Sequence, residues 1–130
     1  MNSSFPQDLL DQMAGEDTHF ARAPEAFFQV WKRGVRIAGP QWFGDGTREG
    51  FERAASKWDL RPTMRRISGA LGILSPGEGV FLAAMASFYN ASEGGALLRR
   101  CGFLGLADLS GLDLERRRVI ADLVLHYNGW

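Results

Sequence analysis

One stretch decides the fold of this chain, SPGEGVFLAAMASFY at residues 75–89. It opens with a capping box, because the Ser75 hydroxyl accepts from the amide three residues on while the Glu78 side chain reaches back, and proline suits the first helical position. Phe81, Met85 and Phe88 then fall on one side, with few polar residues between them. The stretch therefore predicts the most buried helix of an all-α domain.

The flanking segments show the same helical spacing, with apolar residues three and four positions apart. Proline, threonine, asparagine or aspartate stands at the start of each segment and favours helix initiation there. Glycine and proline punctuate residues 35–46, which predicts a loop with room for a short strand at 35–37. We expect helices at about residues 24–33, 47–58, 62–74, 90–101 and 113–128, and a helical turn at 106–109.

Short connections between such helices favour antiparallel neighbours. A chain of 130 residues has the length of a single domain with its own hydrophobic core. We therefore expect a compact bundle of about five to seven short helices. Its predicted core consists of Phe51, Trp58, Ile67, Leu71, Phe81, Met85, Phe88, Val119, Leu123 and Val124.

Charge is unevenly distributed along the chain, although fifteen Lys and Arg balance fifteen Asp and Glu. Residues 1–23 hold four acidic residues and one arginine, which predicts an acidic, partly mobile N-terminal arm before a helical domain at 24–130. Residues 26–66 hold nine Lys and Arg against four acidic residues. The zero net charge gives no general reason to expect a nucleic-acid partner, but this basic segment leaves a local one open.

Aromatic residues are interleaved with the cations of the basic segment. Single-stranded nucleic acids are bound by this combination, through phosphate pairing and base stacking. Nucleic-acid binding by segment 32–66 is therefore the alternative function. Tryptophans in the core and arginines in solvent would give the same composition without that function. The candidate contacts are Arg53, Lys57, Trp58, Arg61, Arg65 and Arg66.

Residue patterns for catalysis are weak in this chain. Residues 44–50 resemble a glycine-rich phosphate loop only in part, and a capped turn explains them as well. Asp122 and His126 share a predicted helix without a nucleophile beside them, and Cys101 follows two arginines that could stabilise a thiolate. Structural roles explain all three features, so we expect no enzyme, no cofactor and no metal site.

A protein partner is the leading functional expectation. Trp42 and Phe43 stand in the predicted loop, and exposed aromatic residues anchor protein interfaces. A single cysteine fits a reducing cytoplasm, and the first residues lack the pattern of a secretory signal. No uncharged run is long enough to cross a bilayer. We therefore expect a cytoplasmic, non-enzymatic protein-binding or regulatory protein without a membrane partner.

Two runs in the second half carry a resemblance. They are LSPGEGVFLAAMASFYN at residues 74–90 and LDLERRRVIADL at residues 112–123. Together they resemble small uncharacterised proteins carried on bacterial mobile elements. The resemblance concerns residues 74–130, rests on helix caps and apolar stripes, and assigns no functional residue. It implies a bacterial cytoplasmic accessory protein whose partner belongs to the host or to the element.

Overall fold

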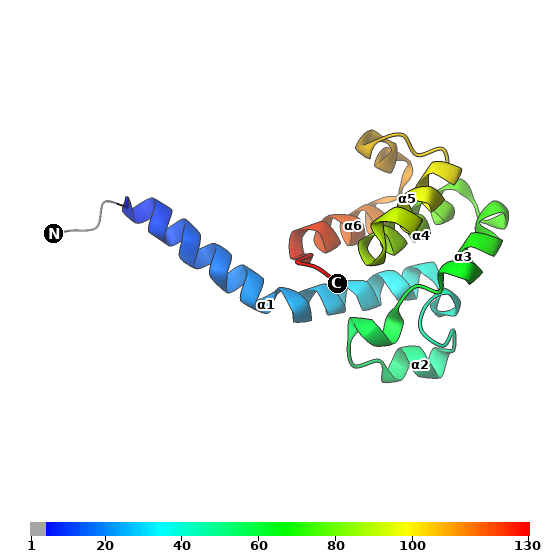
Figure 1. Ribbon diagram of the computed structural model, residues 1–130, viewed down its shortest axis with the longest axis horizontal. Helices are drawn as coiled ribbons and strands as arrows, with labels where there is room; N and C mark the ends of the chain where they lie inside the picture. Colours follow the sequence, from blue (N-terminus) through cyan, green and yellow to red (C-terminus); the bar gives the residue numbers. More distant parts are fainter. Residues whose placement is uncertain (1–4) are drawn as a thin grey trace.

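The computed structural model describes residues 5–130 and confirms an all-α single domain. Within that range no strand forms, and Phe43 and Pro62 make an isolated antiparallel bridge. The α-helices are α1 (Gln7–Ala38), α2 (Arg48–Arg53), α3 (Met64–Ala70), α4 (Pro76–Tyr89), α5 (Ala91–Arg100) and α6 (Leu114–His126) (Figure 1). Four 3-10 turns connect them: η1 (Pro40–Trp42), η2 (Lys57–Leu60), η3 (Leu71–Ile73) and η4 (Leu106–Gly111).

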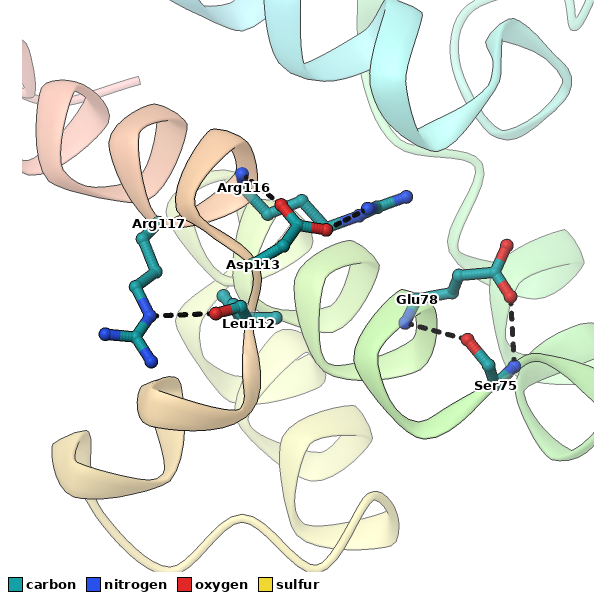
Figure 2. A network of polar contacts seen from close by, with 6 residues as sticks. All are labelled: Ser75, Glu78, Leu112, Asp113, Arg116 and Arg117. Atoms are coloured by element: carbon teal, nitrogen blue, oxygen red, sulfur yellow. Dashed lines mark hydrogen bonds and ion pairs between the residues drawn. The ribbon is translucent and has the colours of Figure 1, made fainter.

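Helix α4 is the centre of the core, as its sequence predicts. The predicted capping box is present: the Glu78 amide donates to Ser75 Oγ at 3.3 Å, and the Ser75 amide donates to Glu78 Oε1 at 3.2 Å (Figure 2). All six residues 81–86 are buried. Because α4 is apolar around its whole circumference, it can pack against α1, α5 and α6 at once.

Helices α4 and α5 form an antiparallel hairpin joined by Asn90, whose side chain accepts from the Glu93 amide at 2.9 Å and caps α5. Gly94 lies where the two helices touch. A Cβ atom there would come within 2.3 Å of Ser87 Cα, so the hairpin needs glycine for its close approach. Packing, rather than backbone flexibility, explains this glycine.

Helices α1 and α6 form the second antiparallel pair. Gly34 of α1 is packed so closely that an added Cβ would lie 3.0 Å from Val119. One residue earlier on α1, Arg33 pairs with Asp122 of α6 at 2.6 Å. The α6 start is fixed by Asp113, whose side chain accepts from the Arg116 amide at 2.8 Å (Figure 2).

The N-terminal helix is longer at both ends than the sequence predicted. Residues 24–33 were expected to form a short helix, yet α1 runs continuously from Gln7 through Pro24 to Ala38. The loop and strand expected after residue 34 are wrong as far as Ala38. Pro24 removes one backbone hydrogen bond, but the helix is held on both sides of it: Phe27 is buried, and His19 bonds to α6. Tertiary contacts thus override the local start signal.

The predictions that Trp58 and Val124 belong to the core are wrong. Helix α2 ends at Arg53, so Trp58 no longer shares a helical face with Phe51 and is 54% exposed. Val124 is 63% exposed because it follows Leu123 by one residue, a rotation of about 100° away from the buried face. Phe88 is half-buried against the core. The other predicted members are buried: Phe51, Ile67, Leu71, Phe81, Met85, Val119 and Leu123.

A cluster of aromatic side chains around Trp31 and Trp130 extends the hydrophobic core. Helical spacing alone did not predict this cluster. Trp31 is fully buried, donates its indole N–H to the Leu60 carbonyl at 2.9 Å and makes an edge contact with Trp130 at 4.9 Å between ring centroids. Trp130 also contacts Phe27 and Tyr89. The segment after α6 therefore packs over α1 and the end of α4.

Candidate interaction surface

The first half of α1 projects from the rest of the molecule. We call residues 7–20 the arm helix; in Figure 1 it extends to the left of the other helices. Every residue from 7 to 18 is exposed. The arm helix is thus a surface along almost all of its length, although it continues directly into the buried half of α1.

A seam that is apolar except at Glu16 runs along α1 from Leu9 to Gly34 with alternating spacings of four and three residues, which is the pattern of a helix that packs against another helix. Its second half is buried. In the first half Leu9, Met13 and Phe20 are between 38% and 48% exposed. The seam consists of Leu9, Met13, Glu16, Phe20, Ala23, Phe27, Val30 and Gly34. The arm helix therefore presents the same face that α4 and α6 cover farther along, but without a cover.

The arm helix is acidic. It contains four carboxylates and neither Lys nor Arg. Glu16 lies in the seam itself, and Asp17 is the next residue on the helix. An apolar stripe flanked by carboxylates is complementary to an apolar groove with a basic rim. Residues 1–23 were expected to be a partly mobile arm with one short helix around Leu9 to Met13, so this longer stripe was not predicted; the spacing of Leu9, Met13 and Phe20 was the available signal.

Two histidines fix the base of the arm helix on α6. The Nε2 atom of His19 lies 2.8 Å from the Leu125 carbonyl oxygen. The rings of His19 and His126 are stacked, with 5.2 Å between their centroids. These contacts set the direction in which the arm helix leaves the domain.

A groove of about 420 Å³ lies between α3 and α5, within the usual size range of binding pockets. Arg100 links the two walls by donating to the Ser68 hydroxyl at 2.8 Å and to the Ser68 carbonyl at 3.0 Å. The groove is lined by apolar Met64, Ala96 and Leu97 and by polar Arg65, Ser68, Glu93 and Arg100. Its two walls, α3 and α5, carry four arginines and one glutamate. Of these charged side chains, two arginines and one glutamate line the groove, which therefore combines apolar residues with a small excess of positive charge.

The two predicted protein-binding aromatics do not form an exposed anchor. Phe43 is only 1% exposed and makes an edge contact with Trp31, so its expected exposure is wrong. It is drawn inward because the chain at residue 43 pairs with Pro62, where the Gly44 amide donates to the Arg61 carbonyl at 2.8 Å. Trp42 is half-buried beside Ala38 and Leu74.

The six nucleic-acid candidates are not gathered on one surface. Lys57 points inward, donates to the Gly129 carbonyl at 2.9 Å and lies over the Trp130 ring at 5.2 Å. Burial lowers its pKa. Arg66 donates to the Gln41 carbonyl at 2.9 Å, and Arg65 lines the groove between α3 and α5.

The remaining three candidates lie beside carboxylates. Trp58 and Arg61 line a cavity of about 440 Å³ whose walls include Asp45 and Asp59. Arg53 lines a neighbouring cavity with the same two carboxylates. Carboxylates at these positions repel phosphate, so the geometry gives this alternative function no common site. It stays a prediction from composition.

The glycine-rich residues 44–50 form a capped turn. Asp45 Oδ1 accepts from the Thr47 amide at 2.9 Å and from the Thr47 hydroxyl at 2.7 Å, and these bonds lower the Asp45 pKa. Thr47 in turn accepts from the Gly50 amide at 2.9 Å. A carboxylate of the chain itself therefore occupies the position where a phosphate would bind.

The weaker catalytic patterns are not assembled either. Asp122 pairs with Arg33 instead of His126, so no carboxylate–imidazole pair forms on α6. Cys101 is half-buried, and burial raises its pKa, although Arg100 acts in the opposite direction. A raised pKa disfavours the reactive thiolate. Asp122 thus links α6 to α1, and Cys101 packs against the hydrophobic core.

Within residues 5–130, no helix combines the length and apolar character needed to cross a bilayer. The same range contains no group of three His, Cys, Asp or Glu side chains placed to hold a metal ion. The resemblance to mobile-element proteins remains a prediction, because comparison with known proteins adds nothing to it. No family model, no curated protein and no solved structure matches this chain.

Proposed function

We propose that this protein is a non-enzymatic interaction module that binds a protein partner through the arm helix. The supporting observation is the seam of α1, whose exposed half repeats the spacing of its buried half. An amphipathic helix gains stability when its apolar face enters a groove of another protein. Leu9 and Met13, one helical turn apart near the end of the arm helix, are the anchors of this interaction.

The partner that fits has an apolar groove rimmed by Lys or Arg. Leu9 and Met13 provide the apolar contact, while Glu16 and Asp17 provide the charges that select a basic rim. Charge at a rim affects association rate and specificity more than affinity, so the apolar pair supplies most of the binding energy. A regulatory or accessory role in a bacterial cytoplasm is the setting that the resemblance to mobile-element proteins implies for such a module.

Affinity capture from a native extract tests this proposal with two matched variants. Leu9→Asp/Met13→Asp places charge in the seam, whereas Ala14→Asp adds charge on another face of the same exposed helix. Partners captured by the unmodified chain and by Ala14→Asp, but lost with the double variant, support the proposal. If the double variant captures the same proteins as the unmodified chain, the arm helix is not the binding element.

A further inference from the structure

The groove between α3 and α5 has the chemistry that the arm helix requires. Its interior offers Met64, Ala96 and Leu97 to an apolar side chain. Two arginines and one glutamate line the groove, whereas the arm helix carries four carboxylates and neither Lys nor Arg. One surface of the molecule thus complements another in both polarity and charge sign.

The arm helix cannot reach the groove of its own chain. Helix α3 lies beside η1, which follows the C-terminal end of α1, because the Thr63 amide donates to the Trp42 carbonyl at 2.8 Å and Arg66 donates to the Gln41 carbonyl. Met13 is separated from Ala38 by 25 residues of continuous helix, about 38 Å at 1.5 Å per residue. Figure 1 shows the arm helix and α3 toward opposite ends of the long axis.

We infer that the arm helix of one copy binds in the α3–α5 groove of a second copy, so that the protein assembles head to tail. This inference rests on the proposed function and names its partner as the same chain. Arm helix and groove are different surfaces, so a pair joined by one such contact leaves one arm helix and one groove free. These free surfaces can bind each other, which closes a reciprocal dimer or a ring, or they can bind further copies and form a chain.

The charges also exclude the simplest alternative arrangement, in which two arm helices pair with each other. Each arm helix contains Asp8, Asp11, Glu16 and Asp17, and no Lys or Arg. Pairing two such helices brings carboxylates of the same sign together, which costs free energy. In the groove, by contrast, the acidic arm helix meets arginine side chains. Raising the salt concentration should therefore weaken the assembly.

Light scattering and sedimentation of the full chain provide the first test. A contact of two helical turns is small and weak, so the measurement should span about 10 µM to about 1 mM. We expect the average mass to rise with concentration above the chain mass of 14.4 kDa. A mass that stays at one chain over the whole range overturns the inference.

Two variants block one surface each. Leu9→Asp/Met13→Asp removes the arm contact, and Arg65→Glu/Ala96→Glu reverses and fills the groove; all four positions are at the surface, so the fold is retained. We expect each variant alone to remain a single chain. Ala14→Asp and Ala121→Glu, which add charge on exposed faces outside the two contacts, should assemble like the unmodified chain.

Mixing the two blocked variants gives the decisive result. The groove of the arm variant and the arm helix of the groove variant are both intact, so an equimolar mixture should form a complex of two chains and no larger species. Dimers of the groove variant alone would show arm-to-arm pairing and overturn the inference. If no variant or mixture associates while capture of a different protein still depends on Leu9 and Met13, the proposed function stands and the second copy is excluded as its partner.

Discussion

Gly94 lets α4 and α5 approach closely, because glycine has a hydrogen atom where alanine has a methyl group. We expect Gly94→Ala to lower the free energy of unfolding by roughly 1–3 kcal/mol, because the new Cβ would overlap the backbone of Ser87. Gly95→Ala is the matched control, since its Cβ has no neighbour closer than Arg99 at 3.6 Å and alanine favours helix. Urea unfolding of both variants measures the difference; equal stability would show that α4 and α5 can separate without cost.

Asp113, which caps α6, makes the stability of the protein depend on pH. Hydrogen bonds from the Arg116 amide and guanidinium hold the pKa of Asp113 below its ordinary value. A pKa lowered by folding stabilises the protein above the unfolded-state value of about 3.9, and this contribution is lost as pH falls through the folded-state pKa.

Asp113→Asn tests that linkage, because asparagine keeps the capping oxygen and removes the charge. We expect a lower urea midpoint than the unmodified chain at pH 7 and a smaller loss between pH 7 and about pH 3. Asp11→Asn, the same change of charge in the arm helix, serves as the control. Identical acid dependence of Asp113→Asn and the unmodified chain would contradict the linkage.

At the scale of elements, helix starts were predictable wherever a side chain caps the backbone locally. Ser75, Thr47, Asn90 and Asp113 all cap the helices that the sequence assigned to them. Helix ends and exposures were less predictable because they depend on distant partners. Pro24 has the local signature of a helix start, and only the contacts of α1 with α6 show that the helix passes through it.

The candidate surface was unpredictable for the same physical reason. Leu9 and Met13 have helical spacing in the sequence, but exposure is a property of what packs against them. Phe43 was expected to be exposed and is buried because Pro62, nineteen residues later, pairs with it. Periodicity identifies apolar faces, whereas only the assembled chain shows which of them remain uncovered.

The segment after α6 can be tested as an element of the core. We expect Trp130→Ala to lower the free energy of unfolding by about 3 kcal/mol, because Trp130 contacts Phe27, Trp31 and Tyr89. Trp58→Ala is the control and should cost less than about 1 kcal/mol, since that side chain is mostly exposed. Chemical unfolding of both variants compares them. A larger loss for Trp58→Ala would mean that the assignment of core and surface is reversed.

On the scale of the whole molecule, the exposed first half of α1 should open more easily than its buried second half. Isolated helices shorter than about 12–15 residues are marginal in water, and residues 7–18 have little packing to support them. We therefore expect fast amide hydrogen exchange at residues 7–18 and slow exchange at residues 27–35, where the seam is buried. Exchange at low protein concentration, followed by mass spectrometry, measures both. Uniform protection along α1 would contradict the division.

The pairing of α1 with α6 also has a consequence for synthesis. Helix α1 leaves the ribosome before α6, the helix that covers it, with 75 residues between their ends at Ala38 and Leu114. At about 5–20 residues per second, α1 waits roughly 4–15 s for its cover. Nascent chains arrested before residue 114 should therefore be cleaved by protease within residues 27–35 of α1, and released chains that include Trp130 should resist cleavage there. During this interval the full seam, including Phe27 and Val30, is accessible to chaperones. Once α6 is complete, only the part of the seam in the arm helix remains accessible.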